Sequence, residues 1–372
     1  MKKWKKRELY YIKKYFSEKK TEDIAIKLNR TYESIRKKAK RLGLDKIYCS
    51  KNKEEYEVFI NSDFGIPVQN IINTYSLENQ RIAEEYFKIN KLRNEGRSIP
   101  EISTLLNISQ SQISPHLYNK SSKALRCIRY LIKNKFLPFK IKNNKETKLI
   151  LRLLASSFCD GHIHKRFLCY KYAGNKKDIL NLYEEVKKVF PFLKLKIDFI
   201  KTKGNINGRE IAGEVYVLII QNSYFCRFLT CLGAPIGDKV LQSFVIPNFI
   251  YDLPYNLKAI FIGQIYSDEG SKPVHTDHSF YLAFKMNKRI ELKNEHMSFL
   301  LEIKSLLNDF GIESGKVSWG RISSRKSGIK TGSGSFYISV KKENLKNFIK
   351  LPIFSEYKAK LIKQDISKKL YS

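Results

Sequence analysis

The length, composition and charge of this chain limit what it can be. It has 372 residues, of which 42% are hydrophobic, so it can build two or three packed domains and is not intrinsically disordered. The 70 lysines and arginines outnumber the 36 acidic residues, which gives a formal net charge of +34. Such an excess opposes compaction unless a polyanion shares the surface, and nucleic acid is the leading partner.

The sequence disfavours membrane insertion, secretion and a disulfide framework. No apolar run reaches 18 residues, and the lysines at the N-terminus are not followed by an apolar leader segment. The six cysteines form no C-x-x-C pair, so a zinc site has little support. We therefore expect a soluble, intracellular and cytoplasmic protein that does not bind membranes.

Residues 1–48 predict three short, basic helices. Asn29 can end the second helix, Thr31 can cap the third, and Gly43 can stop it. The run EDIAIKLNRTYESIRKKAKRLGL resembles the Myb/SANT-like helix-turn-helix family. A basic, solvated bundle is the alternative to DNA contact. The side chains expected on DNA are Arg30, Tyr32, Arg36, Lys37 and Lys40.

Residues 49–80 predict a partly helical connector, and residues 81–140 a second helix-turn-helix followed by a basic helical linker. Ser98 and Glu101 have the spacing of a capping box. The run EGRSIPEISTLLNISQSQISPHL resembles the helix-turn-helix of resolvase-like and phage repressor regulators, with Gln110 and Gln112 as DNA contacts. A structural helical linker is an equal alternative, because Pro115 would kink or shorten the recognition helix.

The remaining chain repeats one unusual step. An apolar helix over 149–160 ends in Asp160 and Gly161, and another over 259–269 ends in Glu269 and Gly270. The two acids lie 109 residues apart (269 − 160), which predicts a duplicated unit with halves at 141–250 and 251–372.

The hydrophobic periodicity after each acid predicts the same series of elements, and hence an α+β fold. In the first half we expect strands at 162–172, 195–202 and 214–220, with helices at 176–190 and 223–232. In the second half we expect strands at 279–285, 316–322 and 335–340, with helices at 292–310 and 344–349.

The runs LRLLASSFCDGHI and FIGQIYSDEGSK resemble the two motifs of LAGLIDADG homing endonucleases, and LGAPIGDK followed by VIPNFI resembles the end of that family's first half. The resemblance covers roughly residues 149–370. It implies a single-chain monomer with internal pseudo-twofold symmetry, in which two αββαββα halves place saddle-shaped antiparallel sheets on double-stranded DNA.

In the family the two motif helices pack against each other. Two pairs of small residues, Ala155 with Cys159 and Gly263 with Ser267, are spaced for such a contact. Ser156, Ser157 and Gln264 stand where the motif has apolar residues, so the first half in particular departs from the pattern.

Phosphodiester hydrolysis needs an activated water and stabilisation of charge on the phosphoryl oxygens, which carboxylate-held divalent cations supply. The resemblance implies that Asp160 and Glu269 hold Mg²⁺, assisted by the backbone carbonyls of Cys159 and Asp268. Asp268 is itself a carboxylate, but alignment on the glycine favours Glu269 as the ligand.

Two lysines take matching places in the halves. Lys239 in GAPIGDK and Lys358 in FSEYKAKL are expected near the active sites, in a supporting electrostatic role. The strands should supply the DNA contacts, although strand register decides which side chains face DNA. The candidates are Lys165, Arg166, Lys171, Lys201, Lys203, Lys285, Arg321, Arg325, Lys326 and Lys330.

These features favour a site-specific, Mg²⁺-dependent DNA endonuclease of the homing type, which the resemblance implies would leave short 3′ overhangs. The alternatives are a regulator that binds DNA on the same scaffold without cutting, and a maturase that binds intron RNA. The chain lacks the terminal His-Asn that protein splicing needs, so we expect a free-standing enzyme or one released from elsewhere.

Overall fold

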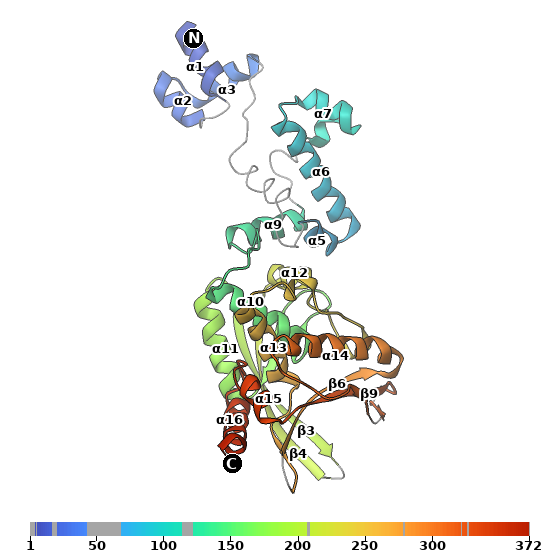
Figure 1. Cartoon of the computed structure of the whole chain (residues 1–372). Coiled ribbons are helices and arrows are strands. Elements are labelled where there is room, and N and C mark those ends of the chain that lie inside the picture. Colours follow the sequence, from blue (N-terminus) through green and yellow to red (C-terminus); the bar gives the residue numbers. More distant parts are fainter. Residues whose placement is uncertain are drawn as a thin grey trace. The chain divides into compact units, whose positions relative to one another are not determined.

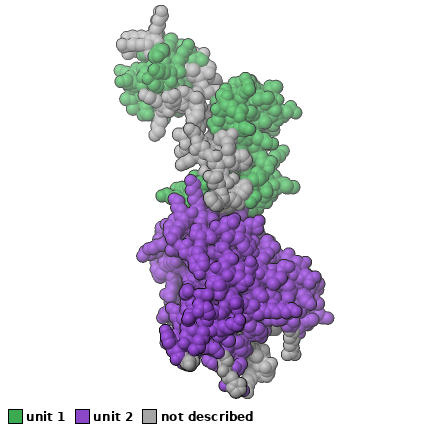
Figure 2. Space-filling view, in the orientation of Figure 1, with its two compact units in different colours: residues 1–62, 67–138 green, residues 63–66, 139–372 purple. Residues whose placement is uncertain are grey.

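The computed structural model describes most of the chain as two compact units, which Figure 2 colours separately. The first comprises residues 1–62 and 67–138, and the second comprises residues 63–66 and 139–372. Within them the structure describes residues 4, 6–16, 21–42, 68–113, 122–206, 209–277, 280–320, 322–325 and 327–371.

The first unit begins with the three helices that the sequence predicts: α1 (Lys6–Tyr15), α2 (Thr21–Leu28) and α3 (Tyr32–Arg41). They pack around a core that includes Ile12, Ile24 and Ile35. Asn29 adopts a φ of 47° where α2 ends, and the Thr31 hydroxyl accepts a hydrogen bond from the Ser34 amide at 3.2 Å. The predicted roles of Asn29 and Thr31 are therefore confirmed, whereas Gly43 lies outside the described residues.

The further helices of this unit include α5 (Val68–Asn73), α6 (Leu77–Asn94), α7 (Ile99–Leu106) and α9 (Lys123–Lys133), and residues 110–113 are also helical. The predicted capping box is present, since Ser98 accepts a hydrogen bond from the Glu101 amide and the Glu101 carboxylate accepts one from the Ser98 amide. Helix α5 and the start of α6 occupy the end of the predicted connector. Its earlier part, and Pro115 in the predicted recognition helix, lie outside the described residues.

The second unit is an α+β structure whose first half contains one antiparallel sheet with the strand order β1-β2-β4-β3. Its elements are α10 (Lys145–Phe158), β1 (Gly161–Ile163), β2 (Tyr170–Gly174), α11 (Lys176–Val189), β3 (Leu195–Ile206), β4 (Arg209–Ile220), α12 (Ser223–Cys231) and the 3-10 helices η1 (Lys239–Leu241) and η2 (Asn248–Ile250).

The second half follows the same plan with the strand order β5-β6-β9-β7, and β8 pairs with β9. Its elements are α13 (Tyr255–Glu269), β5 (Val274–His275), β6 (Phe280–Arg289), the 3-10 helix η3 (Ile290–Leu292), α14 (Lys293–Asn308), β7 (Ser318–Trp319), β8 (Ser323–Ser324), β9 (Lys330–Ile338), α15 (Lys342–Phe348) and α16 (Glu356–Tyr371). Figure 1 shows α14 lying along β6 and β9.

Several predicted strands differ from the structure. The strand expected at 316–322 is reduced to β7 (Ser318–Trp319), and β8 (Ser323–Ser324) lies just beyond it. The strand expected at 162–172 is a hairpin of β1 and β2, whose connection contains Phe167 at a φ of 56°. Alternation of polar and apolar residues does not reveal such a reversal when no glycine or proline marks it. The strand expected from Ser335 begins at Lys330, because Gly332 and Gly334 allow Trp319 and Leu300 to pack against the strand.

The core of this unit joins the two halves. Helices α10 and α13 lie side by side (Figure 1). Phe158 at the end of α10 contacts Phe261 of α13 and Phe299 of α14, with ring centroids 6.1 and 5.9 Å apart, and all three are buried. In the described part of the chain, no helix is both long and apolar enough to cross a membrane.

Candidate active site

Three carboxyl groups gather where α10 and α13 end. Asp160 follows the last residues of α10, and Asp268 and Glu269 close α13. Burial and the charge of Asp160 raise the pKa of Asp268 to about 7 and that of Glu269 to about 8. The two acid-glycine steps that the sequence places far apart are therefore within electrostatic reach of each other.

Asp160 is the most accessible of the three acids, yet the surrounding protein atoms desolvate its carboxyl and raise its pKa. Lys239 and Lys358 act in the opposite direction and lower it. Raised pKa values at three neighbouring acids mean that the protein does not fully compensate their negative charge, so the site favours a bound cation.

The two predicted lysines make equivalent contacts in the two halves. The Lys239 ammonium donates a 2.5 Å hydrogen bond to the carbonyl of Gly161, and the Lys358 ammonium donates to the carbonyls of Gly270 and Ser267. Burial lowers the pKa of both lysines. Each lysine thus contacts the glycine directly after the acid of its own half.

Both glycines are required by close packing. A Cβ atom on Gly161 would lie 2.7 Å from the Ser156 carbonyl oxygen and 2.7 Å from the Tyr170 hydroxyl. A Cβ atom on Gly270 would lie 2.5 Å from the ring of Tyr266. The chain can therefore turn from helix into strand directly behind each acid only where a side chain is absent.

A polar network that sequence reasoning missed crosses between α10 and α13. The Asp268 carboxylate accepts hydrogen bonds from Tyr172 at 2.7 Å and from Gln264 at 2.9 Å, while Gln264 accepts one from Arg152 at 3.3 Å. Arg152 also pairs with Glu185. The sequence identifies Asp268 as a carboxylate beside Glu269, but no local pattern links it to Tyr172, which is 96 residues away.

The predicted contact between small residues is wrong for the second helix. A Cβ atom on Gly263 would lie 2.2 Å from the Pro352 carbonyl oxygen, and the Ser267 hydroxyl accepts a 2.7 Å hydrogen bond from the Phe354 amide. This face of α13 therefore packs against its own half. Gln264 and Phe261, which lie on other faces of α13, do reach α10, where they contact Arg152 and Phe158.

Ser156 and Ser157, which replace apolar residues of the motif, form hydrogen bonds within the protein. Ser156 bonds the Leu153 carbonyl at 3.0 Å and the Tyr170 hydroxyl at 2.5 Å, and Ser157 donates to the same carbonyl at 2.7 Å. Both serines are buried. They therefore do not open the contact between the helices.

The donor set suits a hard divalent cation. Within the described residues, no group of three or more His, Cys, Asp or Glu side chains is arranged to hold a metal by itself. Mg²⁺ nevertheless fits the carboxyl groups of Asp160 and Glu269, because it commonly takes one or two carboxylates and completes its shell with phosphate oxygens and water. One buried oxygen of the neighbouring Asp268 carboxyl has no hydrogen-bond partner. Burial raises the pKa of the Cys159 thiol well above its usual range.

Arg30 does not lie where a DNA contact requires it. Its side chain is only 8% exposed, pairs with Glu8 at 3.0 Å and lies over the Trp4 ring at 4.3 Å. Its prediction as a DNA-contacting residue is therefore wrong. The cation belongs to the core of the three-helix bundle, because it neutralises a buried carboxylate there.

Most other predicted DNA contacts are exposed. The exposed side chains are those of Tyr32, Arg36, Lys37, Gln110, Gln112, Lys165, Arg166, Lys171, Lys201, Lys285, Arg325 and Lys330. The side chains of Lys40, Lys203, Arg321 and Lys326 lie outside the described part. Gln112 also accepts a hydrogen bond from the Ser109 amide at 2.9 Å, and Arg325 pairs with Asp238 at 3.0 Å.

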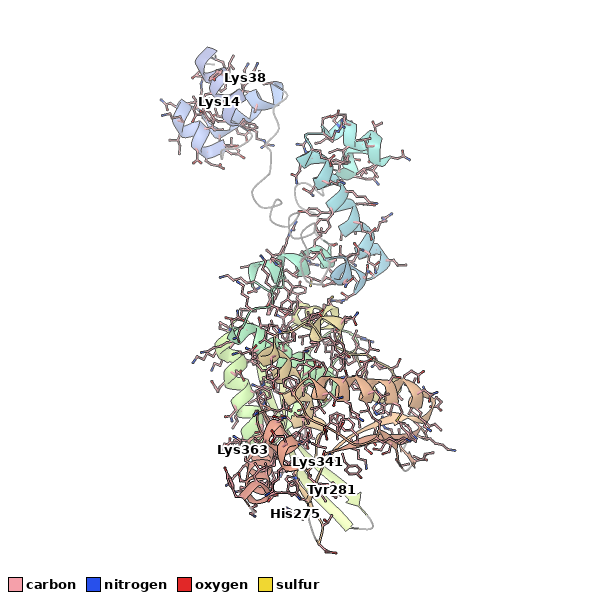
Figure 3. The ribbon with its side chains drawn as sticks, viewed as in Figure 1. Lys14, Lys38, His275, Tyr281, Lys341 and Lys363 are labelled. Atoms are coloured by element: carbon pink, nitrogen blue, oxygen red, sulfur yellow. The ribbon has the colours of Figure 1, made fainter. Side chains whose placement is uncertain are left out.

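The second sheet presents aromatic residues beside the predicted lysine of β6. Buried and accessible positions alternate along β6, which places Tyr281 on the same face as Lys285. The ring of Tyr281 packs against Tyr337 of β9, with centroids 5.3 Å apart. Figure 3 shows Tyr281 near His275. The sequence alone does not determine the register of β6, so it could not show that Tyr281 lies on the same face as Lys285.

Parts of this chain are similar to curated proteins, although no protein-family model matches it. It is 29% identical to the tRNA-splicing ligase RtcB of Methanocaldococcus jannaschii, over 50% of this chain and 20% of that protein. It is 28% identical to the DNA-directed RNA polymerase subunit Rpo1N of the same organism, over 51% of this chain and 15% of that subunit. It is 27% identical to the Replication factor C small subunit, also from this organism, over 46% and 9% of the two chains.

This chain therefore spans about a fifth or less of the length of these relatives. Among solved structures, it is similar to the homing endonuclease I-WcaI bound to its DNA recognition sequence, with a TM-score of 0.37 and 13% sequence identity. That match covers 66% of this chain and 96% of the other chain.

Proposed function

We propose that this chain is a site-specific, Mg²⁺-dependent double-strand DNA endonuclease of the LAGLIDADG homing type. The observation that carries the proposal is the pairing of two equivalent sites. Asp160 and Glu269 lie at the neighbouring ends of α10 and α13, and each is followed by a glycine whose carbonyl accepts a hydrogen bond from a lysine. One acid and one lysine per half provide for two scissile phosphates.

The relatives also support this proposal. A tRNA-splicing ligase, an RNA polymerase subunit and a replication factor have different named functions, yet this chain is similar to a part of each. None of the three named activities explains why parts of this one chain are similar to all three proteins. A module that resides within unrelated host genes explains it, and homing endonucleases are such modules.

Asp160 and Glu269 would hold the metal, with the backbone carbonyls of Cys159 and Asp268 assisting. Bound Mg²⁺ would activate a water and stabilise charge on the phosphoryl oxygens. Lys239 and Lys358 would place positive charge where negative charge develops on the phosphate. Because both lysines are held by main-chain carbonyls, their ammonium groups would need little rearrangement when DNA binds.

The exposed basic side chains would position the DNA backbone. Lys171 and Lys201 in the first sheet, with Lys285 and Lys330 in the second, are exposed basic side chains that could contact phosphates. The helices of the first unit would extend the DNA footprint as helix-turn-helix modules. Contacts of this kind bring strong dependence of affinity on salt concentration.

A cleavage selection tests the proposal. The full chain is incubated with a randomised double-stranded DNA library and Mg²⁺, beside Asp160→Asn and Glu269→Gln variants. We expect discrete double-strand ends with wild type and none with a double variant carrying both substitutions. Sequence-specific binding without cleavage by wild type, with Mg²⁺ or Mn²⁺, would refute the nuclease and support a regulator. Preferential binding of structured intron RNA would support a maturase.

A further inference from the structure

Neither active-site lysine lies on α10 or α13, the helices that deliver the candidate metal-binding acids. Lys239 begins the short helix η1 at the end of the first half, and Lys358 lies in the first turn of α16 at the end of the second. Their main chains therefore need to be held in place by something other than α10 and α13.

The segment that carries Lys239 is held by a buried lysine of the second half. Lys288 of β6 is 2% exposed, and it stands on the face of the strand where buried apolar residues alternate. Its ammonium donates hydrogen bonds to the carbonyls of Lys239 at 2.7 Å and Gln242 at 3.1 Å, and lies 3.6 Å from the Phe244 ring centroid. Burying an ammonium costs free energy unless such partners compensate it, and an apolar residue would suit this position of the strand. The contacts of Lys288 with the main chain of 239–242 therefore explain why a lysine is found there.

A second contact from the same half reaches this segment. Arg325 forms a 3.0 Å ion pair with Asp238, whose carboxylate also accepts a 2.9 Å hydrogen bond from the Val240 amide and so caps η1. Arg325 and Lys288 of the second half therefore bind this segment at Asp238, just before Lys239, and at the carbonyls of Lys239 and Gln242.

The segment that leads to Lys358 is held in turn by the first half. Arg152 of α10 lies over the Phe354 ring at 3.9 Å. At the start of α11, Lys177 pairs with Glu356 at 2.7 Å, and the Asp178 carboxylate accepts a hydrogen bond from the Glu356 amide at 3.2 Å.

We propose that each half of this protein positions the active-site lysine of the other half. We call the two sets of contacts crossed clamps: the first clamp is Lys288 and Arg325 on 238–242, and the second is Arg152, Lys177 and Asp178 on 354–356. These five residues are positioning residues, since they act through Lys239 and Lys358. The inference rests on the proposed function, and it makes the two cleavage sites depend on each other's half.

The two clamps differ in strength. The first centres on a buried ammonium bonded to the main chain of Lys239 itself, whereas the ion pair of Lys177 with Glu356 is mostly exposed and contributes little. Substitutions in the first clamp should therefore have the larger effect.

Strand-resolved cleavage tests the inference. The DNA duplex recovered from the selection is labelled with a different dye on each strand, and cutting of each strand is timed for wild type, Lys239→Met, Lys288→Met and the double variant. Lys239→Met should slow one strand about 100-fold. Lys288→Met should slow that same strand about tenfold or more, because small misplacements of a catalytic group are costly. The double variant should be no slower than Lys239→Met alone.

Equal slowing of both strands by Lys288→Met would overturn the inference, as would multiplied effects in the double variant. Lys304→Met is the matched control, because it removes another lysine bond to a carbonyl, that of Gly315, without touching either clamp. Asp238→Asn is the second variant, to be used if Lys288→Met does not fold. It keeps the cap of η1 and breaks only the exposed ion pair with Arg325, and it should slow the same strand. Phe354→Leu should slow the opposite strand.

A measurement without DNA separates this inference from the proposed function. Amide hydrogen exchange at 238–242 should rise in Lys288→Met and stay unchanged in Lys304→Met. If wild type cuts no DNA and this exchange still rises, the nuclease proposal fails while the clamp stands. If wild type cuts both strands and the exchange does not change, the clamp fails alone.

Discussion

The ammonium of Lys239 donates a 2.5 Å hydrogen bond to the carbonyl of Gly161, 78 residues earlier in the chain. This bond ties a cation of η1 to the residue directly after Asp160. Lys358 repeats it on Gly270 in the second half. The same contact therefore occurs in both halves. It joins each lysine to a glycine, and of these residues only the glycines lie in the two acid-glycine motifs.

The glycine after Asp160 should resist any side chain. In Gly161→Ala the new Cβ atom would meet a backbone carbonyl at 2.7 Å, and backbone yields less readily than a flexible side chain. We expect the free energy of unfolding to fall by roughly 1–3 kcal/mol, the usual range for overpacking. Urea unfolding measures this. Gly315→Ala is the control, since its Cβ atom would have an ordinary contact at 3.7 Å, and an equal loss there would contradict the packing argument.

The two acids at the end of α13 should differ in function. Glu269→Gln should abolish cutting of one DNA strand, because it removes the charge that we assign to metal binding. Asp268→Asn should retain cutting of both strands, since an amide oxygen can still accept the bonds from Tyr172 and Gln264. Cleavage of a duplex with each strand labelled distinguishes them, and the reverse result would assign the metal to the Asp268 side chain.

Asp268 should also make stability depend on pH. Its folded-state pKa of about 7 lies above the ordinary value of 3.8, so the folded protein holds a proton between these values that the unfolded chain has lost. Its contribution to stability is therefore present at low pH and is lost as the pH rises through 7. Relative to wild type, Asp268→Asn should be more stable at pH 8 than at pH 5 in urea unfolding. An unchanged difference would show that burial does not perturb this acid.

His296 should destabilise the second unit in acid. It is 1% exposed and donates a hydrogen bond to the Met286 carbonyl at 3.2 Å, and burial together with the charge of Lys288 lowers its pKa to about 4. Between pH 6.5 and 4 the unfolded chain binds a proton that the folded protein does not, so stability falls as the pH falls through this window. The shift corresponds to roughly 3 kcal/mol. Urea unfolding at several pH values should show a flatter profile for His296→Met than for wild type, and identical profiles would refute the assignment.

Arg30 should support the three-helix bundle rather than bind DNA. Arg30→Met would leave the carboxylate of Glu8 buried without its ion-pair partner, which costs about 3–5 kcal/mol for a buried pair. We expect faster amide hydrogen exchange throughout α1, α2 and α3 in the full chain. Lys37→Met, on an exposed position of α3, should weaken DNA binding and leave exchange unchanged. Normal exchange in Arg30→Met combined with weaker DNA binding would restore Arg30 as a DNA contact.

Local patterns in the sequence determined the helices, their caps and the acid-glycine steps. Asn29, Thr31 and the pair Ser98 with Glu101 act on backbone groups within a few residues, so their effects can be predicted from spacing alone. The repeat at Asp160 and Glu269 was likewise visible, because it consists of two short runs of similar residues.

Only the tertiary structure decided which side chains meet. The bond of Tyr172 to Asp268, the packing of Gly263 on Pro352, the burial of Arg30 and the grip of Lys288 on the main chain of Lys239 join residues far apart in the chain. Such contacts depend on strand register and on which helix face turns inward, and one residue of register moves a side chain to the opposite face. The sequence therefore identified the acids and lysines of the candidate site, whereas the folded chain determined what holds them in place.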